Sequence, residues 1–353
     1  MINVPSWTIV RAMRFGYPNA RVKAMKQSLL QQRDLDAMAD AAGIDEVYSM
    51  LERTSYRQDL VDVSLKEKNI ADQMELACTR NFSRYLKKVS SVIPKDARQV
   101  LAALFEKYEI ENIKILLSAK ENGQAREKTA QLILETGLLS KAIHSRMLDA
   151  KDLKAAISPL EGTVYASVIE KSHSGEKSLP TILSALDSYY FGKMGGIASN
   201  FPREEKIILG LLRSQIDYRN ISMILRSKTG GIPDEKIQEF LIPGGNISRE
   251  KLKQAVAEKT AEAAAHVFED DFNLEAAIDA YKKTGSLIPV EIELEKGYAK
   301  KGLSVLRRSI LSIGAIVGFL LIKEEEVSNI RKIIRAKEFG LPNEKIREML
   351  VVV

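Results

Sequence analysis

The 353-residue sequence has few of the residue types that build disulfides, metal centres and turns. Cys78 is the only cysteine, so neither an internal disulfide nor a cysteine metal cluster can form, and a reducing, cytoplasmic setting is expected. Glycine (20 residues) and proline (10 residues) are scarce. Alanine, leucine, isoleucine, lysine and glutamate abound, which favours helix. No segment alternates between apolar and polar residues as a half-buried strand would, so the sequence predicts an all-α protein.

Long hydrophobic runs are also missing. The longest, residues 309–322, has 14 residues, whereas a membrane-spanning helix needs about 20. We therefore expect a buried core helix there and no transmembrane segment. The N-terminus lacks a clean apolar run followed by a small-residue cleavage site, so no signal peptide is expected.

Catalytic constellations are absent as well. The three histidines, His144, His173 and His266, are scattered without the spacing of metal ligands, and each is expected at the surface. Cys78 lies in an apolar stretch of a predicted helix, where a buried and inert thiol is expected. The sequence thus predicts no catalytic residue, no metal site and no cofactor.

Two further patterns could suggest ligand binding. Residues 191–196 (FGKMGG) contain three glycines but lack the Gly-Lys-Ser/Thr ending of a phosphate loop, so turns are expected. The acidic clusters 269–271 and 324–326 lack calcium-loop spacing. Cluster 324–326 is expected to begin a helix, where negative charge suits the helix dipole.

The charge is nearly balanced, with 53 basic and 47 acidic residues and a net charge of +6. That small excess is weak support for an anionic partner. Residues 1–33 nevertheless contain six basic residues and no acidic one. Such a start can contact lipid head groups or nucleic acid, although a solvated helix face is the interpretation we favour.

What the sequence does contain is an internal repeat. Residues 109–120, 217–228 and 326–337 are near-copies, in which an acid lies three residues before an asparagine and a lysine eight residues after it. The asparagines are 108 and 109 residues apart, which indicates a triplication. The residues that define the repeat are Glu109, Asn112, Lys120, Asp217, Asn220, Lys228, Glu326, Asn329 and Lys337.

The likeness of the last two copies extends further. Residues 231–241 match residues 340–350, and Tyr189 and Tyr298 each lie 31 residues before their asparagine. The first copy has Gly123 but lacks the Gly-x-Pro element. The repeat is about twice as long as solenoid repeats, so each copy is nearer a small domain than a single supersecondary unit.

Three similar helical domains follow from this length, with boundaries predicted at 1–124, 125–245 and 246–353. The strongest linker signal is Leu-Ile-Pro-Gly-Gly-Asn at 241–246, after which residues 248–250 cap a new helix. At the N-terminus we expect a helix from Tyr17, with Pro18 and Asn19 at its start. Near the C-terminus we expect a buried helix over 310–322, followed by a separate repeat helix.

The repeated asparagine permits two interpretations. A polar amide at the same helical position three times could contact a ligand. It could equally satisfy the backbone of a loop in each domain, because an amide both donates and accepts hydrogen bonds. We favour the structural interpretation, since a structural role repeats with the fold whereas a functional site need not.

These motifs resemble the C subunit of archaeal and bacterial A-type (V/A-type) ATP synthases, which is related to the d subunit of the eukaryotic vacuolar ATPase. The opening at residues 17–24 (YPNARVKA) looks like that family's Tyr-x-x-Ala-Arg-Val-Arg motif, and residues 323–331 look like its closing motif. The resemblance covers about residues 17–350. It departs mildly at Ser222, where a basic residue is commoner.

The resemblance implies a funnel of three similar helical domains with pseudo-threefold symmetry. It implies a non-catalytic central-stalk protein on the cytoplasmic side of the membrane, one copy per complex, peripheral to the bilayer. The partners would be the proteolipid rotor ring and the other central-stalk subunits, between which it transmits torque for ion transport and ATP synthesis.

A helical scaffold or nucleic-acid-binding adaptor is the alternative, motivated by the basic N-terminus. It requires aromatic residues interleaved with basic ones on one face, whereas aromatics make up 6% of the chain and lie mostly at core spacing. We therefore predict no nucleic-acid partner. An enzyme ranks third, because no base, nucleophile or metal set is present.

Overall fold

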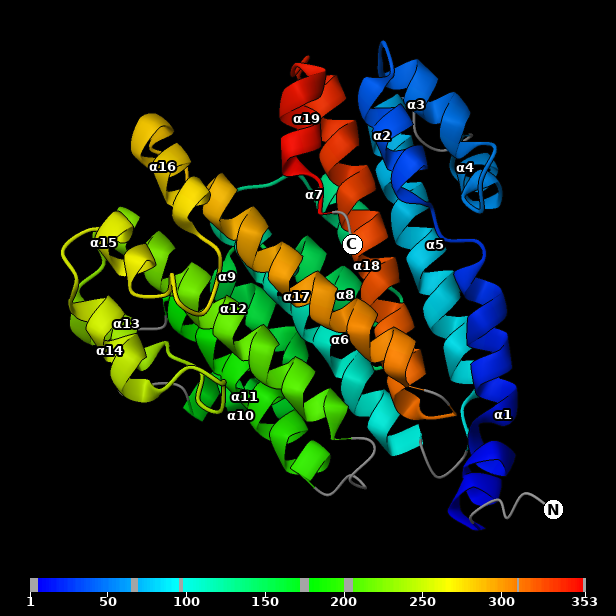
Figure 1. Cartoon of the computed structure of the whole chain (residues 1–353), viewed down its shortest axis with the longest axis horizontal. Coiled ribbons are helices and arrows are strands. Elements are labelled where there is room, and N and C mark those ends of the chain that lie inside the picture. The colour runs from blue at the N-terminus through cyan, green and yellow to red at the C-terminus, as the bar shows by residue number, and fades with distance from the viewer. Residues whose placement is uncertain are drawn as a thin grey trace.

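The computed structural model describes residues 6–64, 69–94, 98–171, 178–199, 206–309 and 311–351. Over these residues the chain forms helices α1 to α19 and one 3₁₀ helix, with no strand (Figure 1). The prediction of an all-α protein is confirmed.

One order of helices occurs three times after the N-terminal α1 (Ser6–Lys26): three short helices, two long ones and a further short one. The long helices form antiparallel pairs through the body of the molecule (Figure 1). Their bounds are α5 (Ile70–Val92), α6 (Arg98–Glu121), α11 (Leu179–Ser199), α12 (Ile207–Thr229), α17 (Ile288–Arg308) and α18 (Ile313–Glu338).

In Figure 1 the short helices α2, α3, α16 and α19 lie toward the top of the molecule, whereas α10 and the N-terminal end of α1 lie toward the bottom. The short helices preceding the long pairs are α2 (Gln32–Asp40), α3 (Ile44–Leu51), α4 (Arg57–Ser64), α8 (Lys141–Asp149), α9 (Leu153–Ile157), η2 (Ser158–Leu160), α10 (Val164–Lys171), α14 (Arg249–Ala257), α15 (Ala261–His266) and α16 (Glu275–Thr284). Those following them are α7 (Arg126–Leu132), α13 (Asp234–Glu239) and α19 (Asn343–Met349).

Packing joins successive repeats. The first long helix of each repeat packs on the second long helix of the repeat before it, so α11 lies against α6 and α17 lies against α12. The same kind of contact joins the first and third repeats, because α5 packs on α18 although the two helices are far apart in the sequence. Figure 1 shows α18 and α19 beside α2 and α5. The domain boundaries at 1–124, 125–245 and 246–353 stay a prediction, since each packed group takes helices from two repeats.

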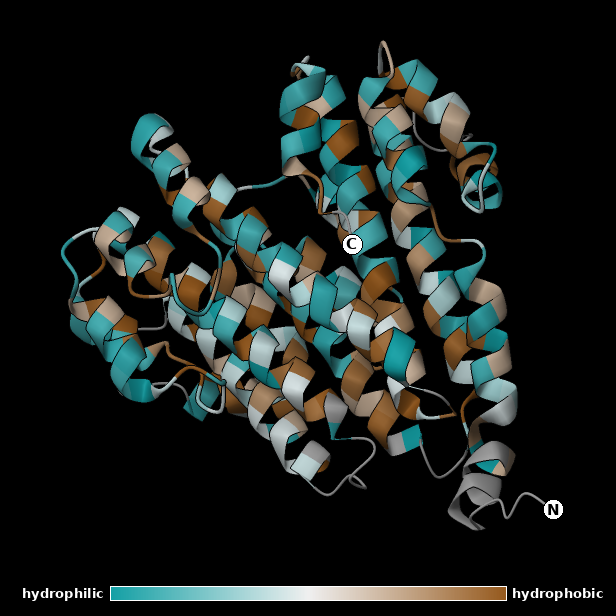
Figure 2. Cartoon of the chain, viewed as in Figure 1, coloured by the Kyte–Doolittle hydropathy of each residue, from teal (hydrophilic) through white to brown (hydrophobic). Residues whose placement is uncertain are grey.

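The apolar residues lie where the long helices meet, and the outer helices carry more polar surface (Figure 2). One buried cluster runs through most of the long helices, and a second joins α12 to α14, α15, α16 and the start of α17. Burial of this size is the main favourable term in folding, and it connects the ends of the chain to its middle.

The N-terminal helix begins earlier than the sequence predicted. It starts at Ser6, and Pro18 lies inside it rather than at its start. Phe15, Pro18 and Val22 are buried, because α1 packs on α5 and α18. A proline within a helix costs about 3 kcal/mol, and burial of this face outweighs that local preference.

The third repeat helix was also bounded wrongly. Residues 313–338 form one continuous helix, α18, rather than a buried helix followed by a separate one; Ile310 lies outside the described residues. Residues 324–326 therefore lie in the middle of a helix and do not begin one. In the same way, the glycines of residues 191–196 lie within α11 rather than in turns. The predicted cap at Ser248 is confirmed, since its hydroxyl accepts a hydrogen bond from Lys251 N.

Candidate functional site

The three repeated asparagines make the same pair of hydrogen bonds. Each side-chain amide donates to the carbonyl oxygen, and accepts from the N–H, of the residue 22 positions later. The six donor–acceptor distances lie between 2.7 and 2.9 Å. The pairs are Asn112 with Leu134, Asn220 with Ile242, and Asn329 with Val351.

Each pair fixes the segment that follows a short helix, α7, α13 or α19, onto the long helix before it. All three asparagines are buried. One donor and one acceptor of the amide are used on one backbone residue. For the buried Ile242 and Val351 these bonds satisfy backbone groups that burial removes from water, whereas the carbonyl of Leu134 also accepts from Thr136 N. This geometry favours the structural interpretation of the asparagine over the ligand-contact one.

The acids of the first two repeats bind the backbone further along the chain. Glu109 accepts hydrogen bonds from Leu139 N at 3.1 Å and from the Thr136 hydroxyl. Asp217 accepts from Asn246 N at 2.8 Å and from Ile247 N at 3.0 Å. In both repeats the acid thereby holds the segment that leads into the next repeat, just before α8 or α14.

The acid of the third repeat binds the beginning of the chain instead. Glu326 accepts hydrogen bonds from Leu30 N at 2.6 Å and from the Tyr56 hydroxyl at 2.7 Å. The fully buried Lys323 is its ion-pair partner. The Lys323 ammonium also lies over the rings of Tyr56 and Tyr85, at 4.4 and 4.6 Å from their centroids. Residues 30, 56, 85, 323 and 326 form what we call the closing cluster.

Two of the three repeated lysines, which lie on long helices, contact the C-terminal ends of short helices. Lys120 donates to the carbonyl of Leu148 in the last turn of α8, and Lys337 donates to the carbonyl of Ala41 just after α2. A cation near a helix C-terminus is favourable because the last carbonyls carry partial negative charge. Lys228 differs, since it pairs with Asp234 at 2.6 Å.

The prediction for His144 was wrong. This histidine is buried, and its Nε2 lies 2.6 Å from Glu109 Oε1. Burial by itself would raise the pKa of Glu109, but hydrogen bonds from His144 and Thr136 outweigh it and lower that pKa. His266 is exposed as predicted, and His173 lies outside the described residues.

Ion pairs link the long helices where they converge. Lys107 on α6 pairs with Glu324 on α18 at 2.7 Å, and Lys114 on α6 pairs with Asp187 on α11 at 3.0 Å. Glu111 on α6 pairs with Arg219 on α12. Burial would raise the pKa of Glu111, but Arg219, Lys114 and Lys107 hold it at about 2. Glu111 therefore stays ionised at neutral pH, and the ion pairs fix the helices relative to one another.

Sequence reasoning missed the Glu111–Arg219 pair, although a signal was present. Glu111 directly precedes Asn112, and Arg219 directly precedes Asn220, so the two charges occupy the same position in successive copies. Opposite charges at equivalent positions are compatible with equivalent faces meeting across an interface. The third copy has Ser328 there.

Next to these ion pairs lies a small apolar pocket that five long helices line. Tyr108, Tyr190 and Tyr298 contribute to its wall, together with Gln215 and aliphatic side chains of α12 and α18. A wider groove opens between α6, α11 and α12. Its half-buried apolar side chains include Ile115, Leu183 and Met223. Partly exposed apolar residues in a concave surface are typical of a binding face.

The described residues contain no group of histidine, cysteine and acidic side chains able to hold a metal. Cys78 is buried, as predicted, and burial raises the pKa of its thiol to about 12. A thiol that is not ionised is a poor nucleophile. Among the helices that the structure describes, none is long and apolar enough to cross a bilayer.

Comparison with known proteins identifies the family. The model of the ATP synthase (C/AC39) subunit family matches residues 18–349. The chain belongs to this family. It is therefore a non-catalytic subunit of an ATP synthase, and the resemblance seen in the sequence is confirmed.

The individual relatives are C subunits of A-type ATP synthases, in agreement with the family match. The chain is 26% identical over 348 residues to the C subunit of the A-type ATP synthase of Methanocaldococcus jannaschii, covering 96% of this chain and 86% of the relative. It is 29% identical to that of Methanobrevibacter smithii, covering 95% and 87%. Identity to that of Pyrococcus furiosus is 26%, covering 95% and 90%.

Proposed function

We propose that this protein couples the central stalk of an ATP synthase to the membrane-embedded proteolipid ring and transmits torque between them. The observation that carries this proposal is membership of the ATP synthase (C/AC39) subunit family over nearly the whole chain. The protein would lie on the cytoplasmic side of the membrane, peripheral to the bilayer, with one copy in each complex. Its three repeats would surround a pseudo-threefold axis as a funnel, divided near residues 124 and 245.

The arrangement of helices supports a mechanical role. A torque-bearing body needs stiff elements and strong connections between them. The long helix pairs are joined by the ion pairs of α6 with α11, α12 and α18. The repeated asparagines tie each connecting segment to a long helix. In this proposal the nine repeat-defining residues are structural and contact neither partner.

We assign the groove between α6, α11 and α12 to the stalk. Ile115, Leu183 and Met223 line it and are partly exposed. Apolar anchors in a concave surface contribute most of the affinity at protein interfaces. A charge placed among them would cost more affinity than the same charge on an open convex surface.

The test is co-elution of the full chain with the detergent-solubilised ring and with purified central-stalk subunits, at low and moderate salt. We expect the native chain to bind both. The double variant Ile115→Glu, Leu183→Glu should no longer co-elute with the stalk subunits but should still co-elute with the ring. Leu138→Glu with Ile288→Glu, at exposed apolar positions elsewhere, should lose neither. A native chain that bound neither partner but retained nucleic acid at low salt would replace this proposal with the adaptor alternative.

A further inference from the structure

A groove lies where α1 meets the turn between α17 and α18. Its basic residues are Lys23 and Lys26 of α1 and Arg307 at the end of α17. Its apolar lining comes from Val22, Leu306, Leu311 and Ala315. Asn19 connects the two walls, because its amide donates to the carbonyl of Ser312 at 3.2 Å. The groove is thus built from both ends of the chain.

The charge around this groove has one sign. Neither α1 (Ser6–Lys26) nor residues 297–322 contain an acidic residue. Lys23, Lys26 and Arg307 are exposed, and none of them pairs with a carboxylate of the described residues. The opposite end of the molecule differs: there Arg347 pairs with Asp40 and Lys345 pairs with Glu348. Unpaired cations gathered at one place create a field that attracts anions.

Two large apolar side chains stand in solvent on the same helix. Met13 is 81% exposed and Tyr17 is 66% exposed. They are four residues apart, so they lie on one face of α1, whereas Phe15 and Val22 are buried against the body. The N-terminal half of α1 projects beyond the other helices (Figure 1). Exposed tyrosine and basic side chains on one projecting helix are typical of segments that rest in a bilayer interface.

We propose that this groove binds the head group of an anionic phospholipid and that α1 rests on the bilayer surface. Lys23, Lys26 and Arg307 would bind the phosphate. The aliphatic lining would contact the glycerol and the first methylene groups. Tyr17 and Met13 would enter the interface beside it. The inference rests on the proposed function, since that function places the protein next to the membrane that holds the ring.

The lining residues favour lipid over nucleic acid. Single-stranded nucleic acid is bound by aromatic side chains that stack on the bases, placed among basic residues. The residues that line this groove are basic, small or aliphatic, and none of them is aromatic. An aliphatic floor beneath three cations matches a molecule that carries a phosphate at one end and hydrocarbon at the other.

The first experiment is co-sedimentation of the purified full chain with vesicles of phosphatidylglycerol and phosphatidylcholine, and with vesicles of phosphatidylcholine alone. We expect binding to the anionic vesicles only, weakening as salt rises. The triple variant Lys23→Gln, Lys26→Gln, Arg307→Gln should bind about a hundredfold more weakly, because each basic side chain near an anionic surface contributes about fivefold.

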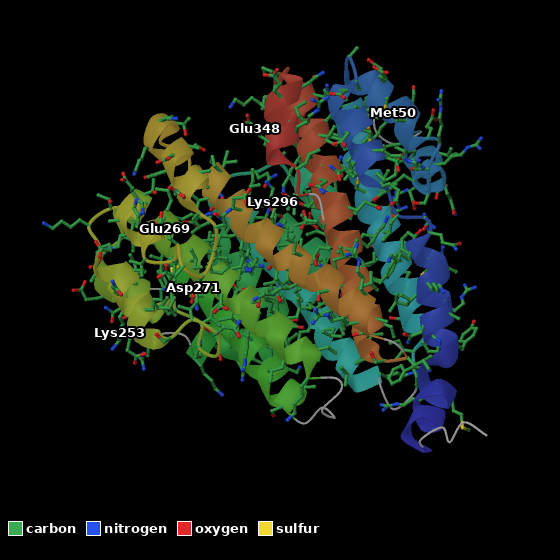
Figure 3. The ribbon with its side chains drawn as sticks, in the orientation of Figure 1. Met50, Lys253, Glu269, Asp271, Lys296 and Glu348 are labelled. Atoms are coloured by element: carbon green, nitrogen blue, oxygen red, sulfur yellow. The ribbon has the colours of Figure 1, made fainter. Side chains whose placement is uncertain are left out.

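A matched control has the same loss of charge elsewhere. This control variant replaces three exposed lysines around α14, α15 and α16 by glutamine: Lys253→Gln, Lys259→Gln and Lys283→Gln. Figure 3 shows Lys253 on the side of the molecule away from α1. This control should bind anionic vesicles within about twofold of the native chain. Equal weakening in both triple variants would mean that net charge rather than the groove governs binding, and would overturn the proposal.

A second measurement reports on α1 directly. In a Trp7→Phe background, Tyr17→Trp places the only tryptophan at position 17. Its emission should shift to shorter wavelength with anionic vesicles and stay unchanged with phosphatidylcholine vesicles. An unchanged spectrum, or failure of the native chain to bind anionic vesicles, would overturn the proposal. Preferential retention of a single-stranded oligonucleotide by the groove would do the same.

The coupling function and the lipid site are tested by different measurements, so failure of one can be told from failure of the other. Co-elution with ring and stalk in detergent does not require the lipid site, so the triple variant at the groove should still co-elute. Loss of vesicle binding with intact co-elution would remove only the lipid site. Loss of co-elution by the native chain would remove the coupling function, whatever the vesicles show.

Discussion

The junction between the third and first repeats differs from the two junctions that the chain crosses covalently. Glu109 and Asp217 hold backbone that follows them by about thirty residues. Glu326 instead binds Leu30 and Tyr56, which precede it by nearly 300 residues. The same acid position thus serves all three junctions. At the first, Glu109 contacts the buried His144, and at the third, Glu326 pairs with the fully buried Lys323.

The difference shows how a repeat protein can join its ends. Within the chain, covalent continuity keeps the next repeat close, and two or three hydrogen bonds suffice to orient it. Between the ends, association must be maintained by contacts alone. The closing cluster supplies a charge pair, two hydrogen bonds and two aromatic faces around one ammonium group. Removal of one charge from such a cluster leaves the other charge buried without a partner, which strongly destabilises the fold.

Glu326→Gln is expected to have the largest effect on this comparison. It keeps an acceptor for Leu30 but leaves Lys323 buried without a charge partner, which typically costs about 3–5 kcal/mol. Asp217→Asn, the matched change at a covalent junction, has no buried lysine beside it and should cost about 1–2 kcal/mol. Urea unfolding of both variants measures the difference. Equal costs would show that the closing cluster adds nothing to an ordinary junction.

The asparagine pairs should give the next largest effect. Asn220→Ala leaves the N–H and carbonyl of Ile242 buried without partners, and we expect a cost of about 3 kcal/mol. Asn112→Ala should cost about half as much, because the carbonyl of Leu134 keeps a hydrogen bond from Thr136 N at 3.1 Å. Asn122→Ala, at an exposed position, should stay within about 0.5 kcal/mol. Thermal unfolding and hydrogen exchange at residues 134 and 242 test this order; a larger cost at Asn112 would contradict it.

Unlike the preceding substitutions, removal of one carboxyl on α18 should stabilise the protein at high pH. Burial raises the pKa of Glu325 to about 8, with Glu295 and Glu324 adding to the rise. A carboxyl whose pKa is raised on folding stabilises the protein below its unfolded pKa, and this contribution is lost as pH rises toward 8. Glu325→Gln should therefore be nearly neutral at pH 4.5 and stabilise by about 2 kcal/mol at pH 9.

Urea unfolding at the two pH values measures this change. The control is Glu344→Gln, at an exposed position on α19. It should change the free energy of unfolding by the same amount at both pH values. A Glu325→Gln variant with the same effect at pH 4.5 and 9 would show that the carboxyl is already ionised in the folded protein.

The repeated lysines should give the smallest effect. Lys228, whose side chain is 7% exposed, pairs with Asp234, whose side chain is 46% exposed. Because water reaches the Asp234 carboxylate, the coupling of Lys228→Met with Asp234→Ala in a double-mutant cycle should be about 0.5 kcal/mol. Lys120→Met, which removes a donor from the carbonyl of Leu148, should cost about 1 kcal/mol. A coupling above about 2 kcal/mol would place Lys228 with the closing cluster rather than among surface pairs.

Much of the fold could be predicted because the signals were local. Helical periodicity, few glycines and prolines, and the cap at Ser248 depend on neighbouring residues, and the all-α prediction was confirmed. Errors occurred where packing overrode a local preference. Pro18 lies inside α1 because that helix is buried on α5 and α18. His144, which has no special neighbours in sequence, is buried because Glu109 accepts its hydrogen bond.

The candidate site was predicted only in part. The nine repeat-defining residues were found by comparison of the copies. Apart from close partners such as Asp234 for Lys228, however, their partners lie 22 to nearly 300 residues away. Nothing in the pattern pointed to Leu30 or Tyr56 as partners of Glu326, because the equivalent backbone in the other repeats follows the acid rather than preceding it. The groove at α1 depends on residues near both ends of the chain.

The sequence by itself determined the helical class, the threefold repetition and the family, since each is written in residue type and spacing along the chain. Tertiary structure decided which repeat packs on which, where the ends meet and which charges are buried together. The physical reason is that helix formation depends on contacts three or four residues apart. Pairing between α5 and α18 brings together residues on opposite ends of the chain, and their position emerges only when the whole apolar core is buried at once.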